Sequence, residues 1–180
     1  MPTSDRARRI ALLTLLASSV FVALTAQAQT PPPGPGPRCT AAEHRQFDFW
    51  LGSWIVTANG KVAGSNRIEL DLEGCSLFES WSGAGGSRGR SMSFYDRARR
   101  QWHQTWIDSS GGVLELDGHL VGGSMVLEGA TPDPASGKIG HERISWTPDN
   151  DGSVRQLWEH REDGEEKWSV VFDGLYRRQP

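Results

Sequence analysis

Short runs of alternating apolar and polar residues follow one another along the chain from about residue 52 to its end. Alternation with a period of two is typical of β-strands with one buried face, and Asn-Gly, Glu-Gly and Gly-Gly pairs are typical of the turns between them. The pattern predicts ten strands, spaced about a dozen residues apart. They are expected at residues 54–56, 67–72, 76–82, 90–95, 101–108, 113–120, 124–128, 142–147, 154–160 and 167–172.

Tight turns between all of these strands predict an antiparallel sheet, because parallel strands need long crossover connections and no helical stretch is long enough for one. An open meander of this size would leave two long edges, which closure into a barrel removes. We therefore predict an all-β fold, an up-and-down antiparallel β-barrel. A short helix is expected before the first strand, at residues 41–51, with Thr40 and Glu43 as its capping box.

The first 28 residues have the features of a secretory signal. Three arginines precede an apolar run at 10–24, and Ala26 and Ala28 place small residues before a cleavage point. We predict a signal peptide over 1–28, with an uncleaved anchor as the alternative. The protein is then periplasmic or secreted.

Five prolines among residues 30–38 predict an extended linker over 29–38, and the remaining residues, 39–180, form one domain by size. Removal of the signal leaves 16 basic and 21 acidic residues, and this mildly acidic balance argues against a nucleic-acid partner. A second long apolar segment is absent from the sequence, so no stable membrane span is expected after cleavage.

Two cysteines, Cys39 and Cys75, lie in the exported part of the chain. An even number of cysteines in an oxidising compartment favours a disulfide, which would join the segment before the first strand to the start of the third. Two separate buried thiols are the alternative. A pair of isolated cysteines without neighbouring histidines gives no support for a metal site.

Eight tryptophans lie in the mature domain, seven of them on predicted strands. Small barrels are either filled by side chains or hollow, so the indoles either pack the interior or line a cavity for a flat or apolar ligand. The candidate ligand-binding residues are Trp81, Trp102, Gln104, Trp106, Trp146, Gln156 and Trp158.

The two faces of the predicted strands lead to different chemistry. Gln156 and Trp158 share one face of their strand, whereas Arg155 and Glu159 share the other. With the first face inward, the barrel encloses an aromatic cavity with a few amide groups, which suits binding. With Arg143, Arg155 and Glu159 inward, buried charges pair and a carboxylate with a perturbed pKa performs acid–base chemistry. Glu79 and Glu159 are the candidate carboxylates for such an enzyme. Alternation alone does not decide between the two faces.

Gly52-Ser53-Trp54, on the first strand, resembles the G-x-W signature of calycin barrels, the lipocalins and their relatives. The resemblance implies that Trp54 closes one barrel end beneath a basic residue near the last strand, here Arg177 or Arg178. The segments FDFWLGSW, GSNRIELDLEGCSLFESW, SFYDRARRQWHQTWID and RISWTPDNDGSVRQLWEHREDGEEKW resemble a group of secreted bacterial proteins of unknown function (the DUF1579-like group). That likeness implies a fold and a compartment but no activity.

Two classes of function remain open. The first is a carrier or sensor whose partner is a small hydrophobic or aromatic molecule. The second is a calycin-type enzyme, a cyclase, isomerase or hydratase acting on a hydrophobic substrate; a haem barrel with His160 as axial ligand is a further alternative. The sequence has no G-x-S-x-G nucleophile and no phosphate-binding loop, and we expect no cofactor.

Overall fold

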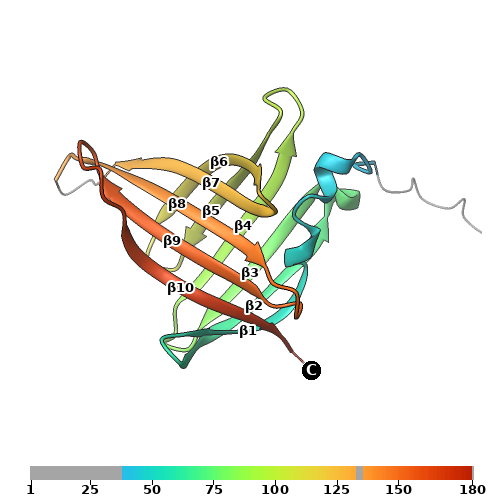
Figure 1. Cartoon of the computed structure of the whole chain (residues 1–180), viewed down its shortest axis with the longest axis horizontal. Helices are drawn as coiled ribbons and strands as arrows, with labels where there is room; N and C mark the ends of the chain where they lie inside the picture. The colour runs from blue at the N-terminus through green and yellow to red at the C-terminus, as the bar shows by residue number, and fades with distance from the viewer. Residues whose placement is uncertain (1–37, 133–135, 180) are drawn as a thin grey trace, which may run out of the picture. The chain divides into compact units, whose positions relative to one another are not determined.

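A computed structural model describes residues 38–132 and 136–179 of the chain. Ten antiparallel strands close into an up-and-down barrel (Figure 1), which confirms the predicted fold. The predicted signal peptide and all of the predicted linker except Arg38 lie outside the described residues.

All ten predicted strands are present, and most are longer than expected because the turns between them are tight. The last strand is displaced most: it starts two residues later than predicted, at Ser169, and continues to Arg178. The strands are β1 (Gly52–Ala58), β2 (Lys61–Asp71), β3 (Ser76–Gly83), β4 (Arg88–Asp96), β5 (Gln101–Asp108), β6 (Val113–Val121), β7 (Ser124–Pro132), β8 (Ile139–Pro148), β9 (Val154–Glu162) and β10 (Ser169–Arg178).

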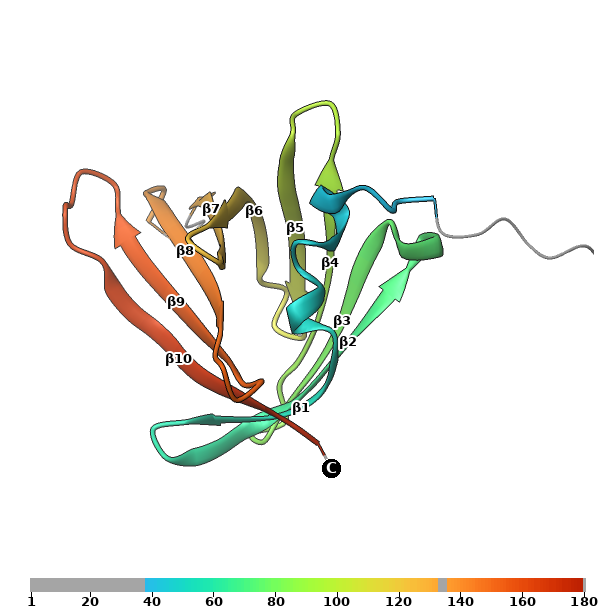
Figure 2. The same cartoon turned by 45° about the vertical axis from the view of Figure 1, so that its right-hand side comes forward.

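Each strand pairs with its neighbours in the chain, and β1 also pairs with β10 to close the barrel (Figure 2). In this closing pair, Trp54 lies opposite Arg178 and Thr57 lies opposite Leu175. Closure leaves none of the described strands as an open sheet edge.

The segment before β1 forms two short 3-10 helices, η1 (Ala42–Arg45) and η2 (Asp48–Trp50), instead of one continuous helix. The predicted capping box is wrong, because the residue before η1 is Ala41 and no side chain caps that helix. In a 3-10 helix, residues three apart lie above one another. Phe47 and Trp50 have this spacing and stack on each other, and their packing outweighs regular α-helical hydrogen bonding here. Within the described residues, no helix has the length and apolar character needed to span a bilayer.

The predicted disulfide is confirmed: Cys39 and Cys75 are bonded, with their Cα atoms 4.9 Å apart. Cys75 follows a short 3-10 helix, η3 (Leu72–Gly74), between β2 and β3. The bond therefore ties the segment that precedes η1 to the wall of the barrel. An ion pair between Arg38 Nε and Glu73, 3.0 Å long, lies next to it.

A cluster of fully buried aromatic residues closes one part of the barrel interior. Phe47 stacks on Trp50 with their rings 5.0 Å apart, and both contact Trp146 of β8. Phe47 also meets Trp102 of β5. Trp54 donates a hydrogen bond of 2.9 Å from Nε1 to the carbonyl of Trp50. We call these five side chains, together with Tyr176, the aromatic plug.

Arg178 covers the outer side of this plug, as the calycin resemblance implied for Arg177 or Arg178. Its guanidinium carbon lies 4.5 Å from the centre of the Trp54 ring. Its Nη1 donates a hydrogen bond of 3.0 Å to the carbonyl of Leu51, immediately before β1. Arg178, at the end of the last strand, thus contacts both the plug and the segment before β1 that carries Phe47 and Trp50.

Candidate functional site

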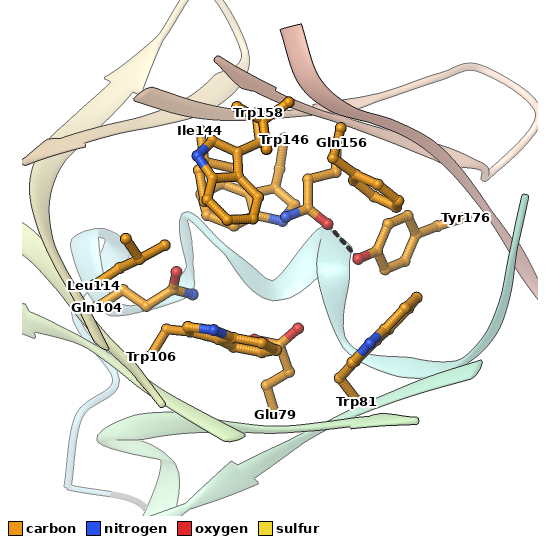
Figure 3. Close-up of a pocket in the computed structure, with 12 residues that line it drawn as sticks. Glu79, Trp81, Gln104, Trp106, Leu114, Ile144, Trp146, Gln156, Trp158 and Tyr176 are labelled. Carbon is orange, nitrogen blue, oxygen red and sulfur yellow. Dashed lines mark hydrogen bonds between the residues drawn. The ribbon is translucent and has the colours of Figure 1, made fainter. Parts of the chain in front are cut away.

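A cavity of about 220 Å³ lies inside the barrel next to the aromatic plug (Figure 3). Six of the seven predicted ligand-binding residues line it: Trp81, Gln104, Trp106, Trp146, Gln156 and Trp158. The half-exposed Val171 also lines the cavity, so the cavity reaches the protein surface. The barrel is therefore filled at the plug and hollow next to it.

Trp102, the seventh predicted residue, lies outside the cavity. Its ring packs against Phe47, and its Nε1 donates a hydrogen bond of 3.1 Å to Gln46 Oε1 between the two 3-10 helices. Trp102 shares a strand face with Gln104 and Trp106, but it belongs to the aromatic plug and not to the cavity lining. Period-two alternation gives the face of a residue and not its depth along the barrel.

Sequence reasoning missed most of the remaining lining residues. Leu114 and Ile144 are ordinary inward positions of their strands, so the alternation could have found them. Val171 and Phe172 are consecutive, and a register irregularity between Val170 and Phe172 brings both to the cavity. Bulges of this kind carry no signal in a simple alternation pattern. The other lining residues are Glu79, which was predicted as a candidate acid, and Tyr176.

Hydrogen bonds join the polar side chains of the cavity into one belt. Glu79 Oε1 accepts a bond of 2.6 Å from Asn66 Nδ2, and Glu79 Oε2 accepts one of 2.5 Å from Ser91 Oγ. Asn66 also donates to the Tyr176 hydroxyl at 3.3 Å, and that hydroxyl donates to Gln156 Oε1. The belt thus runs from β9 across β10 and β2 to β3 and β4.

Gln104 extends the belt to β5 by donating from Nε2 to Ser93 Oγ at 3.0 Å and to Ser91 Oγ at 3.3 Å. Within the described residues, Gln104 Oε1 and Gln156 Nε2 have no hydrogen-bond partner in the protein. Figure 3 shows both amides at the lumen. They leave one acceptor and one donor for a ligand.

Burial raises the pKa of Glu79 above its ordinary value, although the hydrogen bonds from Ser91 and Asn66 and the charge of Arg90 act in the opposite direction. Burial also raises the pKa of Tyr176 well above its ordinary value, and the nearby charge of Glu79 adds to this effect. Tyr176 is therefore a neutral hydroxyl at physiological pH, and it can both donate and accept in the belt.

The open space depends on a glycine in the barrel wall. A Cβ atom placed on Gly89 of β4 would lie 1.9 Å from the ring of Trp106, so this indole lies flat against the backbone of its neighbouring strand. Any larger residue at position 89 must displace the ring, which lines the cavity.

Further from the plug along β8 and β9, Glu142 holds two side chains in place. It accepts bonds of 2.6 Å from Trp158 Nε1 and 2.8 Å from His160 Nδ1. Glu142 is buried, with 7% of its surface exposed, whereas His160 is partly exposed. The hydrogen bond to Glu142 raises the pKa of His160, against a smaller opposing effect of burial. The Glu142–His160 pair thus fixes the orientation of Trp158, which lines the cavity.

This pair predicts a pH-dependent contribution to stability. Because the folded-state pKa of His160 is raised, the stabilisation is fully present below its ordinary pKa of about 6.5 and is lost as pH rises through the folded-state pKa. His160→Gln should therefore lower the free energy of unfolding more at pH 5.5 than at pH 8.5, measured by urea denaturation. The exposed His119, replaced in the same way, is the control. Equal losses at both pH values would contradict the prediction.

Arg143, Arg155 and Glu159 lie on the outer face of the barrel, not in the cavity. Arg143 Nη2 is 3.0 Å from Glu159 Oε2, and the Arg143 guanidinium also covers the ring of Trp168 at 4.2 Å. Arg155 pairs with Asp173 at 2.7 Å. The face that carries Gln156 and Trp158 therefore points inward. Of the two candidate acids, only Glu79 lines the cavity.

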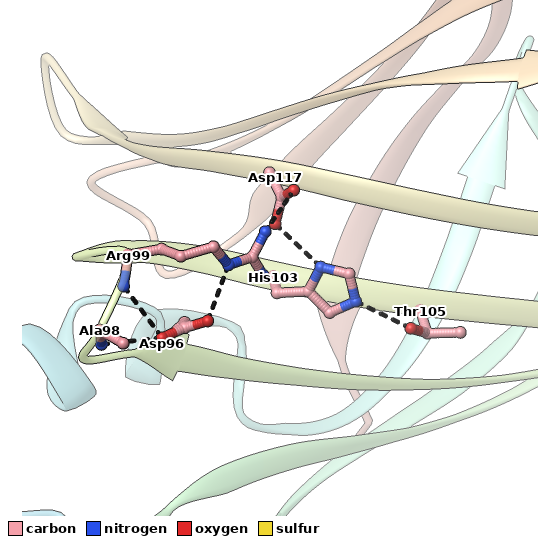
Figure 4. Close-up of polar contacts among 6 residues, drawn as sticks. All are labelled: Asp96, Ala98, Arg99, His103, Thr105 and Asp117. Carbon is pink, nitrogen blue, oxygen red and sulfur yellow. Dashed lines mark hydrogen bonds and ion pairs between the residues drawn. The ribbon is translucent and has the colours of Figure 1, made fainter.

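A second polar cluster lies on the outer face of β5 and β6 (Figure 4). His103 bridges Asp117 Oδ1 and Thr105 Oγ1, each at 2.9 Å, and Asp117 Oδ2 is 2.9 Å from Arg99. Burial raises the pKa of Asp117, but the bonds from His103 and Arg99 outweigh it, so the net shift is downward. The order Asp–His–Thr resembles a charge relay, but neighbouring strand positions and a turn arginine account for every contact. We assign the cluster a structural role.

No family model matches the chain, and no curated protein matches it significantly. The assignment of function therefore rests on the cavity itself.

Proposed function

We propose that this protein binds a small, flat, apolar or aromatic molecule inside its barrel. One observation carries the proposal: a cavity that reaches the surface is lined mainly by aromatic rings and contains a few convergent polar groups. Apolar walls with a small number of placed hydrogen-bonding groups are the usual composition of small-molecule sites.

The cavity volume limits the ligand to a small molecule. An apolar cavity of about 150 Å³ accommodates benzene, so by proportion 220 Å³ suits roughly nine non-hydrogen atoms. Sites for drug-sized ligands are larger, about 300–1,000 Å³. We propose a ligand with a single ring, or two fused rings, held between indoles.

We further propose that the protein is an exported member of the calycin type and acts as a carrier or sensor. The disulfide supports an oxidising compartment. The contact of Arg178 with Trp54 supports the calycin resemblance. The cavity gives less support to the alternatives. None of the described lining residues is a histidine, and the space does not accommodate a porphyrin. For an enzyme, Glu79 is the only lining carboxylic acid among the described residues.

Isothermal titration calorimetry of the mature protein with propylbenzene and 2-phenylethanol tests the proposal. Both probes match the estimated ligand size, and saturable binding of either one at a single site is the expected result. Absence of heat with both probes, together with no small molecule released from the denatured protein in mass spectrometry, would overturn it. Conversion of a probe into product would instead favour an enzyme.

Gly89→Ala should weaken binding of these probes. The added methyl group pushes the Trp106 ring into the lumen, and a ligand must push it back against an overpacking cost of about 1–3 kcal/mol, so we expect about fivefold to 150-fold lower affinity. Gly85→Ala is the matched control, because a Cβ atom on Gly85 meets no other atom within 4 Å. If both variants bind as the unchanged protein does, Trp106 does not form part of the binding site.

A further inference from the structure

Glu79 is an unusual residue to find in an aromatic cavity. Its side chain is buried, with only 5% of its surface exposed, and it takes part in no ion pair among the described residues. Buried carboxylates in proteins are normally paired with a cation or neutralised. In the part of the chain that the structure describes, Glu79 has hydrogen-bond donors but no counter-ion inside the barrel.

The polar and charged groups around Glu79 lie on three strands, β2, β4 and β10. Ser91 of β4 and Asn66 of β2 are neutral donors on the neighbouring strands. Tyr176 of β10 faces the carboxyl group and stays neutral, as described above. Arg90 of β4 is the cation whose charge reaches Glu79, but it is exposed on the outer face, where it donates to the carbonyl of Gly89.

The carboxylate also has bonding capacity that the protein does not use. A carboxylate offers about four acceptor positions on its two oxygens. Asn66 and Ser91 occupy one position on each oxygen. Figure 3 shows Glu79 rising between the indoles of Trp106 and Trp81, with Trp158 on the far side of the lumen. The faces of aromatic rings, indoles most strongly, attract organic cations.

We propose that the ligand is a small organic ammonium ion with a flat apolar group, and that Glu79 is its counter-ion. The inference rests on the proposed function, because it names the chemical class that the same cavity takes. The ammonium group donates to the free acceptor positions of Glu79 and lies against the indoles, while the apolar group fills the remaining volume. Binding supplies the buried carboxylate with the cation that the protein lacks.

This pairing couples binding to a proton. Burial raises the pKa of Glu79, so at pH values below that pKa the cation binds with loss of the carboxyl proton to solvent. Below the pKa of Glu79 in the free protein, affinity for an ammonium ligand should fall by up to about tenfold per pH unit. Affinity for a neutral ligand of the same shape should not follow this dependence.

The experiment compares 2-phenylethylamine with 2-phenylethanol, two probes of equal size of which only the first is a cation at neutral pH. Calorimetry at pH 5, 6, 7 and 8, in two buffers with different ionisation enthalpies, gives affinities and the number of protons released. We expect the amine to bind about tenfold to a hundredfold more tightly than the alcohol at pH 8, as charge-assisted hydrogen bonds allow. The advantage should shrink as pH falls.

Glu79→Gln should abolish this preference. The amide can accept from Asn66 and donate to Ser91, so the belt remains bonded. Amine affinity should fall to that of the alcohol, while alcohol affinity changes less than about twofold. Glu159→Gln is the matched control, because it makes the same chemical change on the outer face, where Glu159 pairs with Arg143.

The outcomes separate the two proposals. If the alcohol and propylbenzene bind but the amine binds no more tightly at any pH, the ammonium proposal is wrong and the proposed function stands. If none of the three probes binds and the denatured protein releases no small molecule, the proposed function fails. The unmodified protein decides the question through its pH dependence even if Glu79→Gln does not fold.

Discussion

Replacement of both cysteines, Cys39→Ser with Cys75→Ser, is expected to lower the free energy of unfolding by about 3–4 kcal/mol. The disulfide closes a loop between residues 36 positions apart, and the entropy of that closure in the unfolded chain gives this magnitude. The bond also holds the start of the segment that carries Phe47 and Trp50 into the barrel. Urea denaturation of the variant and the oxidised protein, monitored by tryptophan fluorescence, measures the difference.

Reduction of the unchanged protein with dithiothreitol should reproduce most of this loss. Glu73→Gln is a control for the neighbouring surface, since it removes only the exposed ion pair with Arg38 and should cost less than about 1 kcal/mol. A loss below 1 kcal/mol on removal of the disulfide would mean that the packing of the plug holds this segment without covalent help.

The strands could be read from the sequence because each of them has a buried face and lies between turn residues. Two-residue turns such as Asn59-Gly60, where both residues have positive φ, fix the pairing of adjacent strands and so the antiparallel order. The segment before β1 was harder to predict. Its spacing of apolar residues fits an α-helix and a 3-10 helix equally well, and the choice depends on where Phe47 and Trp50 meet the barrel.

The residue types of the candidate site could be predicted from the sequence. Which strand face points inward, and how far along the barrel each residue lies, could not. Tryptophan and arginine alternate on β8 and β9, so both faces looked capable of being buried, and only closure of the barrel places Trp158 inside and Glu159 outside. Trp102 and Trp106 share a face but lie at different heights. Glu79 was a candidate acid by residue type, whereas its hydrogen bonds to β2 and β4 follow from the strand register.

The aromatic plug explains how a small barrel stays hollow without collapsing. Hydrophobic burial is concentrated where Phe47, Trp50 and Trp54 pack together, and this dense region carries much of the stabilisation. The cavity walls can then keep Trp106 flat against Gly89, with a polar belt fixing the strands around it. The aromatic plug thus stabilises the barrel, and the adjoining cavity is left for binding.

Trp54→Ala tests this division and should be the most destabilising single substitution in the plug. The side chain is fully buried, and truncation of a buried tryptophan to alanine costs about 3–5 kcal/mol. It also removes the hydrogen bond to the Trp50 carbonyl and the ring beneath Arg178. We expect a loss of about 4–5 kcal/mol in urea denaturation, at the upper end of that range.

Trp168→Ala is the matched control, since Trp168 lies on the outer face with Arg143 and Arg161 over its ring. Loss of partly exposed cation–π contacts should cost about 1 kcal/mol. If Trp54→Ala lowers the free energy of unfolding by several times more than Trp168→Ala does, the plug carries the larger share of the stability. If instead Trp54→Ala cost as little as Trp168→Ala, the plug would be dispensable, and the polar belt and the disulfide would have to hold the barrel around its cavity.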